Sequence, residues 1–197
     1  IEARKQGKSH ILSFGGAYSN HIHALAAAGY YLGFKTTAII RGEAHYANNP
    51  TLKQAQKWGM NLQFVTRNEY KKRAQPDYLQ TLQQTFPDAL IVPEGGSNAF
   101  ALLGMHELCE ELVTQCDGNI DHVITATGSG GTLAGLISGF SQLHKSTNIE
   151  GVAVLKQADY LREEVTTLIN KADIDKSLSW HLHTEFHGGG YAKVSQP

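Results

Sequence analysis

Two stretches of the sequence place hydroxyl and glycine residues where they could bind an anion. The first, SFGGAYSNH at 13–21, has two glycines followed by Ser19, Asn20 and His21. The second, TATGSGGTLAGL at 125–136, contains a run of small residues: Gly128, Ser129, Gly130, Gly131 and Thr132. Each stretch stands between an apolar run and a pattern of helical spacing. Free backbone N–H groups at a helix N-terminus would favour a carboxylate or a phosphate there.

The first stretch predicts a capped helix with polar side chains at its N-terminus. Ser19 or Asn20 stands where an N-cap belongs. The apolar positions that follow predict one buried stripe: Ile22, Leu25, Ala26, Gly29 and Leu32. The hydroxyl and amide side chains would add directional hydrogen bonds to an anion such as a carboxylate. An ordinary capped helix without a ligand has the same residue types, so this stretch alone leaves both interpretations open.

The second stretch, residues 128–132, predicts a phosphate site, which we call the glycine loop. A Walker-type loop requires a lysine followed by serine or threonine, whereas Gly131 is followed by Thr132 and Leu133. A dinucleotide fingerprint requires glycine or alanine where Leu133 stands, and an acidic residue where the next strand ends at Lys156. A small phosphorylated ligand bound by backbone amides and hydroxyls remains, and pyridoxal phosphate fits. The alternative is a tight turn without a ligand.

The elements that must position these residues alternate along the chain. Apolar or β-branched runs predict strands at 11–14, 36–40, 61–65, 89–92, 122–126 and 151–155. Helical spacing predicts helices at 20–32, 50–58, 76–86, 99–115 and 131–144. This alternation predicts the α/β class, with parallel sheets covered by helices on both faces. The PEGGSN stretch predicts a domain boundary that gives units 1–92 and 93–197.

Composition and charge limit the class of partner. The chain has 197 residues, and 17 basic against 18 acidic residues give a formal net charge of -1. Because there is no basic tract and no apolar run long enough to cross a bilayer, we expect neither nucleic acid nor a membrane as partner. Cys109 and Cys116 are too far apart along one helical pattern for a disulfide, so we expect buried thiols and a cytoplasmic protein. The charged run at 67–73 predicts a solvated surface.

Three motifs, in this order and spacing, resemble one family of enzymes: GGAYSNH, PEGGSNAFALLG and TATGSGGTLAG. They are similar to the fold type II, tryptophan-synthase-β-like pyridoxal-phosphate enzymes. More narrowly, they resemble the 1-aminocyclopropane-1-carboxylate deaminase and D-cysteine desulfhydrase family. The resemblance runs from the strand at 11–14 to HGGGYAKVSQP at the end of the chain. It implies two open parallel-sheet αβα units, incomplete here, and a homodimer.

The resemblance also implies a role for each matched residue. Ser19 would hold the substrate carboxylate with His21 beside it, and the matching serine has a nucleophilic role in the deaminase branch. Asn20 would bind the phenolic oxygen of pyridoxal phosphate, and the glycine loop would hold its phosphate. Tyr191 would lie near the substrate and take part in proton movement or in nucleophilic addition. The implied reaction on a small amino acid is β-elimination from D-cysteine to pyruvate, ammonia and sulfide, or deamination of 1-aminocyclopropane-1-carboxylate to 2-oxobutanoate and ammonia.

Two family residues have no match in this sequence. The Schiff-base lysine of the family lies in a Gly-Asn-Lys-like motif upstream of the GGxxSN loop, which would place it before Ile1. The second tyrosine of the family lies in an Asp-Pro-Val-Tyr-like stretch beyond Pro197. The lysines that are present do not stand in that setting: Lys5, Lys8, Lys71, Lys72 and Lys156. We therefore expect the chain as given to be inactive alone, as part of an active parent enzyme.

Two other classes of protein remain as alternatives. One is a non-catalytic protein that keeps the glycine loop for pyridoxal phosphate and has lost catalysis. The other is a metal-binding α/β protein, because HLHTEFH at 181–187 would place His181, His183 and Glu185 on one face of a strand. We expect no metal, since His21 has a place beside the predicted cofactor site and His23 would face the other way on its helix.

Overall fold

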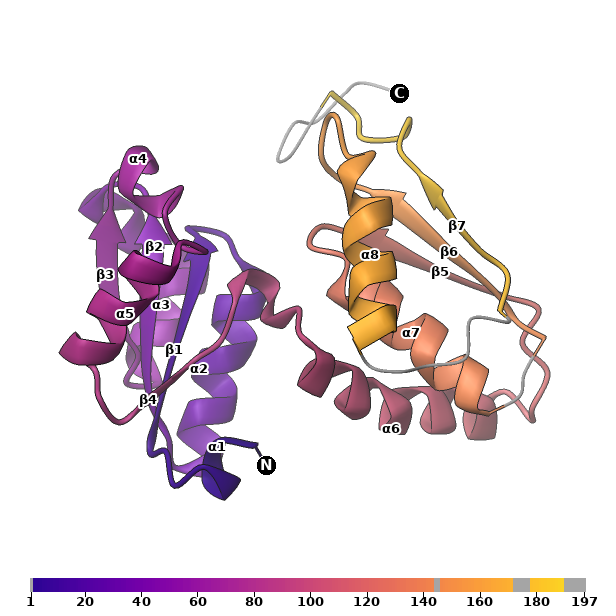
Figure 1. The fold of residues 1–197 in the computed structure, drawn as a ribbon, viewed down its shortest axis with the longest axis horizontal. Helices are drawn as coiled ribbons and strands as arrows, with labels where there is room; N and C mark the ends of the chain where they lie inside the picture. Colours follow the sequence, from indigo (N-terminus) through magenta and orange to yellow (C-terminus); the bar gives the residue numbers. More distant parts are fainter. Residues whose placement is uncertain (1, 144–145, 172–177, 190–197) are drawn as a thin grey trace. The chain divides into compact units, whose positions relative to one another are not determined.

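The computed structural model describes residues 2–143, 146–171 and 178–189. The chain divides into two compact units, Ile1–Gly96 and Ser97–Pro197, which Figure 1 shows in sequence colours. The division follows Gly96, whereas the sequence predicts it after Val92. Each unit holds its own parallel sheet, so the α/β class and the parallel strands are confirmed.

The first unit is a four-stranded parallel sheet in the order β3-β2-β1-β4. Its strands are β1 (His10–Gly16), β2 (Lys35–Arg41), β3 (Asn61–Val65) and β4 (Ala89–Ile91). Its helices are α1 (Glu2–Lys5), α2 (Asn20–Leu32), α3 (Pro50–Lys57), α4 (Arg67–Tyr70) and α5 (Pro76–Thr85), with 3-10 turns η1 (Ala44–Asn48) and η2 (Glu94–Gly96). The connections between parallel strands are long enough to contain these helices, as crossovers require.

Both faces of this first sheet are buried. On β2, Ala38 and Ile40 belong to one hydrophobic cluster with Ile22 and Ala26 of α2. Ile39 points the other way, into a second cluster with residues of β1, α4, α5 and β4: Leu12, Phe14, Tyr70, Leu82 and Ala89. Successive side chains of a strand alternate between faces, so a strand buried on both sides needs a continuous apolar run. This explains why β2 is readable from the sequence.

The second unit is a three-stranded parallel sheet in the order β5-β6-β7. Its strands are β5 (His122–Thr127), β6 (Asn148–Ala153) and β7 (Trp180–His183), and its helices are α6 (Ala99–Gln115), α7 (Gly131–Gln142) and α8 (Tyr160–Lys171). Helix α7 contacts β5, β6 and both other helices, and Figure 1 shows it between α6 and the sheet. Its residues 133–141 are all buried, so α7 forms the centre of this unit.

Helices cover one face of the second sheet within the described residues, whereas the sequence predicts cover on both. The buried hydrophobic residues here form a single cluster around α7, which includes Ile149 and Ala153 of β6. Ile124 of β5 points to the opposite face and is 66% exposed. Glu150 of β6 lies beside Ile124 in the strand register. Because one face of this sheet is polar and exposed, β6 begins with alternating polar and apolar residues rather than with an apolar run. The strand predicted at 151–155 therefore starts later than β6 does.

The burial of several predicted surface and core residues differs from expectation. Leu32 and Cys116 are exposed rather than buried. Tyr70, in the charged run at 67–73, is buried, and its hydroxyl donates a hydrogen bond to Glu94 Oε1 at 2.6 Å. Arg73 Nε donates to the other oxygen of Glu94 at 2.6 Å. The expectation of a solvated surface therefore holds for most charged side chains of this run, which are exposed, and is wrong for Tyr70, which is buried beside the ion pair of Arg73 and Glu94.

The sequence predicts neither the short helices α1 and α4 nor the longer helix α8. The buried residues of α8, Leu161, Val165, Leu168 and Ile169, have the spacing of one helix face. None of the helices that the structure describes is long and apolar enough to cross a membrane. The two cysteines are free thiols, and burial raises the pKa of Cys109 to about 11.

Candidate functional site

The glycine loop connects the end of β5 to the start of α7, as the sequence predicts. Gly130 is the N-cap residue of α7, with φ of 81°, and it provides no side chain to accept from the first turn. The N–H groups of the first helical turn therefore have no side-chain cap. Gly128, Ser129 and Thr132 are exposed, so a ligand can reach these donors. The loop thus brings all five predicted residues together at one helix N-terminus.

Close contacts within the second unit explain two of the three glycines. A Cβ atom at Gly130 would lie 2.9 Å from Val165 Cγ2, in a backbone conformation that L residues rarely adopt. A Cβ atom at Gly131 would lie 2.5 Å from Ser97 Oγ. At Gly128, however, a Cβ would meet only Val154 Cγ2, at an ordinary contact distance of 3.9 Å. Packing among the described residues therefore does not explain the glycine at 128.

Ser97 is a member of this site that the sequence analysis does not identify. Its Oγ lies 2.8 Å from Ser129 Oγ, in a hydrogen bond that either hydroxyl could donate. The two residues are 32 positions apart, so no local spacing connects them. The PEGGSN stretch contains Ser97 and was used for the domain boundary, but its composition gives no role to this hydroxyl.

The Ser-Asn-His stretch lies in the first unit, at the N-terminus of α2. Ser19 is the N-cap residue, and its Oγ accepts a hydrogen bond from Ile22 N at 3.3 Å. This bond uses the hydroxyl oxygen as an acceptor and leaves its proton to donate. Asn20 is the first residue of the helix and is exposed. The helix bounds and the cap are therefore as predicted.

His21 is held by a hydroxyl from the neighbouring strand. Its Nε2 lies 2.7 Å from Ser13 Oγ, and Ser13 Oγ donates to Val92 O at 2.9 Å. A serine hydroxyl has one proton, so Ser13 must accept from His21, which fixes the proton of the imidazole on Nε2. Burial lowers the pKa of His21, against an opposing effect of Glu94. The side chain is therefore neutral, with Nδ1 left as its acceptor.

Acidification is expected to destabilise the chain through His21. Because burial holds its pKa below the usual 6.5, the unfolded chain binds a proton that the folded chain resists. The free energy of unfolding is then largest above pH 6.5 and falls as the pH drops below that value. Urea denaturation at several values between about pH 7 and about pH 5 gives the free energy of unfolding as a function of pH. The slope of this free energy against pH should be smaller for His21→Asn than for the wild type.

The control for this experiment is His45→Asn, at an exposed histidine of the same unit. It should keep the wild-type slope. A residual slope is expected in His21→Asn, because burial also lowers the pKa of His10. If the slopes of His21→Asn and the wild type coincide, the neutral state assigned to His21 is wrong.

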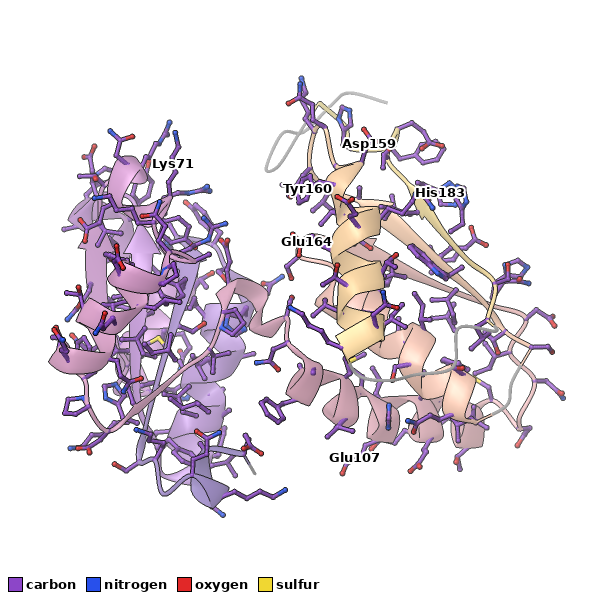
Figure 2. All side chains as sticks on the ribbon, in the orientation of Figure 1. Lys71, Glu107, Asp159, Tyr160, Glu164 and His183 are labelled. Atoms are coloured by element: carbon purple, nitrogen blue, oxygen red, sulfur yellow. The ribbon has the colours of Figure 1, made fainter. Side chains whose placement is uncertain are left out.

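Two histidines of the second unit form hydrogen bonds to one glutamate. His122 Nδ1 and His183 Nε2 lie 2.8 and 2.9 Å from the two carboxylate oxygens of Glu150, and Figure 2 labels His183 on β7. These hydrogen bonds lower the pKa of Glu150 and raise the pKa of His183. Glu185 lies beyond the end of β7. No group of three or more histidine, cysteine or acidic residues that could hold a metal ion occurs within the described ranges.

Comparison with protein families gives a match that extends along almost the whole chain. The family described as pyridoxal-phosphate dependent enzyme matches residues 1–195. The chain belongs to the pyridoxal-phosphate dependent enzyme family. This family uses the cofactor that the glycine loop predicts, and the exposed, uncapped start of α7 fits a phosphate group.

Individual relatives are similar to almost the whole chain. A D-cysteine desulfhydrase of Klebsiella pneumoniae is 28% identical over 99% of this chain and 63% of its own length. A Pyrococcus horikoshii protein, provisionally named as a 1-aminocyclopropane-1-carboxylate deaminase, is 25% identical over 98% of this chain and 61% of its own length. The chain thus spans somewhat less than two thirds of these relatives.

The fold is that of the fold type II pyridoxal-phosphate enzymes. The crystal structure of a 1-aminocyclopropane-1-carboxylate deaminase homologue superposes with a TM-score of 0.82 at 22% identity. This comparison covers 98% of the present chain and 61% of the other. At this level of identity the likeness concerns the fold, so it confirms the predicted architecture.

Two further expectations for a pyridoxal-phosphate enzyme concern a tyrosine and the lysines. Tyr191 lies outside the described residues. Among the residues that the structure describes, no lysine is buried. Lys8 Nζ donates to Pro87 O at 2.9 Å, Lys156 is exposed after β6, and Lys71 is exposed near α4, as Figure 2 shows.

Proposed function

We propose that this chain binds pyridoxal phosphate with its phosphate group at the glycine loop. The phosphate would accept hydrogen bonds from the backbone N–H groups of residues 131–133 and from the hydroxyls of Ser129 and Thr132. The observation that supports this most directly is the N-terminus of α7, where Gly130 supplies no side-chain cap and the neighbouring residues are exposed. A dianionic phosphate is also stabilised by the positive end of the helix dipole.

We assign Ser19, Asn20 and His21 to the substrate and to the ring of the cofactor. When bound, pyridoxal phosphate supplies an electron sink for negative charge at Cα of an amino acid. The Ser19 hydroxyl can donate a hydrogen bond to the substrate carboxylate. The side-chain amide N–H of Asn20 can donate a hydrogen bond to the phenolic oxygen of the cofactor. His21 can contribute its backbone N–H and Nδ1, because Nε2 is bound to Ser13. Ser19 and Tyr191 are the residues that we propose as catalytic.

For the gene product that contains this chain, we propose a lyase or deaminase reaction on a small amino acid. β-Elimination from D-cysteine with uptake of water would release pyruvate, ammonia and sulfide. Ring opening of 1-aminocyclopropane-1-carboxylate, also with uptake of water, would release 2-oxobutanoate and ammonia. The names of the relatives support both reactions. Incubation with each amino acid, followed by identification of the keto acid, distinguishes them. Release of neither keto acid by the cofactor-loaded gene product would contradict the proposal.

We further propose that none of the described lysines attaches the cofactor covalently, and that the chain is inactive alone. A lysine that reacts as a nucleophile at neutral pH usually has its pKa lowered by burial or by a neighbouring cation. The described lysines lack such burial. Catalysis by this chain would therefore depend on a lysine amine that is buried or close to a cation, and not on the glycine loop alone.

Borohydride reduction tests this assignment. The chain and the gene product that contains it are each mixed with pyridoxal phosphate, reduced, digested and analysed by mass spectrometry. We expect one selectively labelled lysine in the gene product, outside the described residues. Selective labelling of Lys156 or another described lysine would overturn the assignment. A gene product that binds the cofactor without any labelled lysine would instead support the non-catalytic alternative.

By the same family resemblance we propose a cytoplasmic homodimer. Sedimentation equilibrium of the gene product measures the mass of the particle, which should be twice that of one chain. A monomer across the accessible range of protein concentrations would contradict the dimer.

A further inference from the structure

A pair of serine hydroxyls lies against the start of α7, and one of them comes from outside the glycine loop. Ser97 Oγ and Ser129 Oγ are 2.8 Å apart. The Cα, Cβ and Oγ atoms of Ser97 would all lie within 3.3 Å of a Cβ atom at Gly131. Ser97 therefore occupies the space beside the first residue of α7, where the uncapped N–H groups begin.

The position of Ser97 is fixed by the elements around it. Asn98, the next residue, is the N-cap of α6, and its Oδ1 accepts from Ala101 N at 3.0 Å. Further along α6, Met105 lies against Gly135 of α7 so closely that a Cβ there would be 2.3 Å from Met105 Cγ. The start of α6 and the start of α7 are thus held in one packed pair. Ser97 directly precedes this capped and closely packed helix.

The number of hydroxyl protons determines which serine donates the hydrogen bond within the pair when a phosphate is bound. Each hydroxyl has one proton, and the bond between them uses one of the two. A phosphate dianion can only accept, so a hydroxyl facing it must donate. If Ser129 donates to phosphate, its oxygen is left to accept, and Ser97 is the donor 2.8 Å away. Hydrogen bonds in such a chain polarise one another, which strengthens the bond to the anion.

We infer that Ser97 is a positioning residue of the cofactor site, which orients the Ser129 hydroxyl toward the phosphate of pyridoxal phosphate. This inference rests on the proposed binding of the phosphate at the glycine loop. A purely structural role for Ser97, in which it only stabilises the contact between the starts of α6 and α7, predicts a different result. Loss of such a contact changes the stability of the protein. It does not change how strongly the site prefers a ligand with a phosphate over one without it.

The test compares two ligands, pyridoxal phosphate and pyridoxal, on four proteins and a control. The proteins are the wild-type gene product that contains this chain and its Ser97→Ala, Ser129→Ala and double variants. The control is Ser179→Ala, at an exposed serine of the second unit. Equilibrium dialysis gives the ratio of the dissociation constants of pyridoxal and pyridoxal phosphate. We expect Ser97→Ala to lower this ratio about threefold to tenfold, as for a lost hydrogen bond in a charged network. The control should keep the wild-type ratio.

The double variant tests whether Ser97 acts through Ser129. Its ratio should equal that of Ser129→Ala, because Ser97 has nothing to orient once Ser129 is removed. If the double variant lowers the ratio by the product of the two single-variant factors, the two serines act independently and the positioning role is wrong. An unchanged ratio in Ser97→Ala would overturn it as well. A wild-type ratio near one would overturn the proposed phosphate site, and the inference with it. Thermal unfolding of each variant shows whether a lost ratio reflects an unfolded protein.

Discussion

Replacing Gly131 with alanine is expected to weaken the binding of pyridoxal phosphate by about 10- to 100-fold. The added Cβ would lie 2.5 Å from Ser97 Oγ and 3.3 Å from Ser97 Cα, so Ser97 and the start of α7 cannot both keep their places. The change acts on the N–H groups that would face the phosphate and on the serine pair together. Equilibrium dialysis with pyridoxal phosphate measures the loss.

Gly104→Ala is the matched control for this variant. Gly104 lies within α6, and a Cβ there would meet nothing within 4 Å. The control should bind pyridoxal phosphate as the wild type does. If Gly131→Ala remains folded and also binds like the wild type, the phosphate does not lie at the start of α7.

The second large effect is expected at Gly139, where α6 and α7 are in close contact. A Cβ at Gly139 would lie 2.4 Å from Cys109 Sγ and 2.9 Å from Cys109 Cβ. Gly139→Ala should therefore lower the free energy of unfolding by about 1–3 kcal/mol, the usual cost of overpacking. Gly104→Ala, on the open side of α6, should instead raise it by about 0.5–1 kcal/mol through helix propensity. Urea denaturation of the three proteins measures both changes.

A second substitution at Cys109 shows whether the loss comes from this contact. Cys109→Ala removes the sulfur atom that the new Cβ would meet first. In the double variant the two changes should cost less than the sum of the single variants. If Gly139→Ala is as stable as the wild type, or if the losses simply add, the close packing of α6 on α7 is not what requires a glycine at 139.

Local signals in the sequence predict much of the fold and part of the site. The predicted helices at 20–32 and 99–115 coincide with α2 and α6 because Ser19 and Asn98 cap their N-termini with side-chain oxygens. The glycine loop is predicted equally well, since its residues are consecutive and lie between a strand and a helix. In each case the residues that decide the structure are neighbours in sequence.

The other features depend on residues that are distant in sequence. Ser97 meets Ser129, and Ser13 meets His21 and the carbonyl of Val92, only after the sheets have formed. The side chain of Tyr70 is buried because Glu94 provides a partner for its hydroxyl. A serine or a tyrosine in a polar segment gives no local indication of such a partner. These contacts could not be predicted from composition, periodicity or capping.

Backbone NMR tests most directly whether the phosphate of pyridoxal phosphate binds at the glycine loop. The ¹⁵N-labelled chain is titrated with pyridoxal phosphate and, separately, with pyridoxal. The amide signals of residues 131–133 are predicted to move strongly with pyridoxal phosphate and little with pyridoxal, because only the phosphate accepts hydrogen bonds from these N–H groups. If pyridoxal phosphate binds while these three signals stay in place, the phosphate lies elsewhere and the account is wrong.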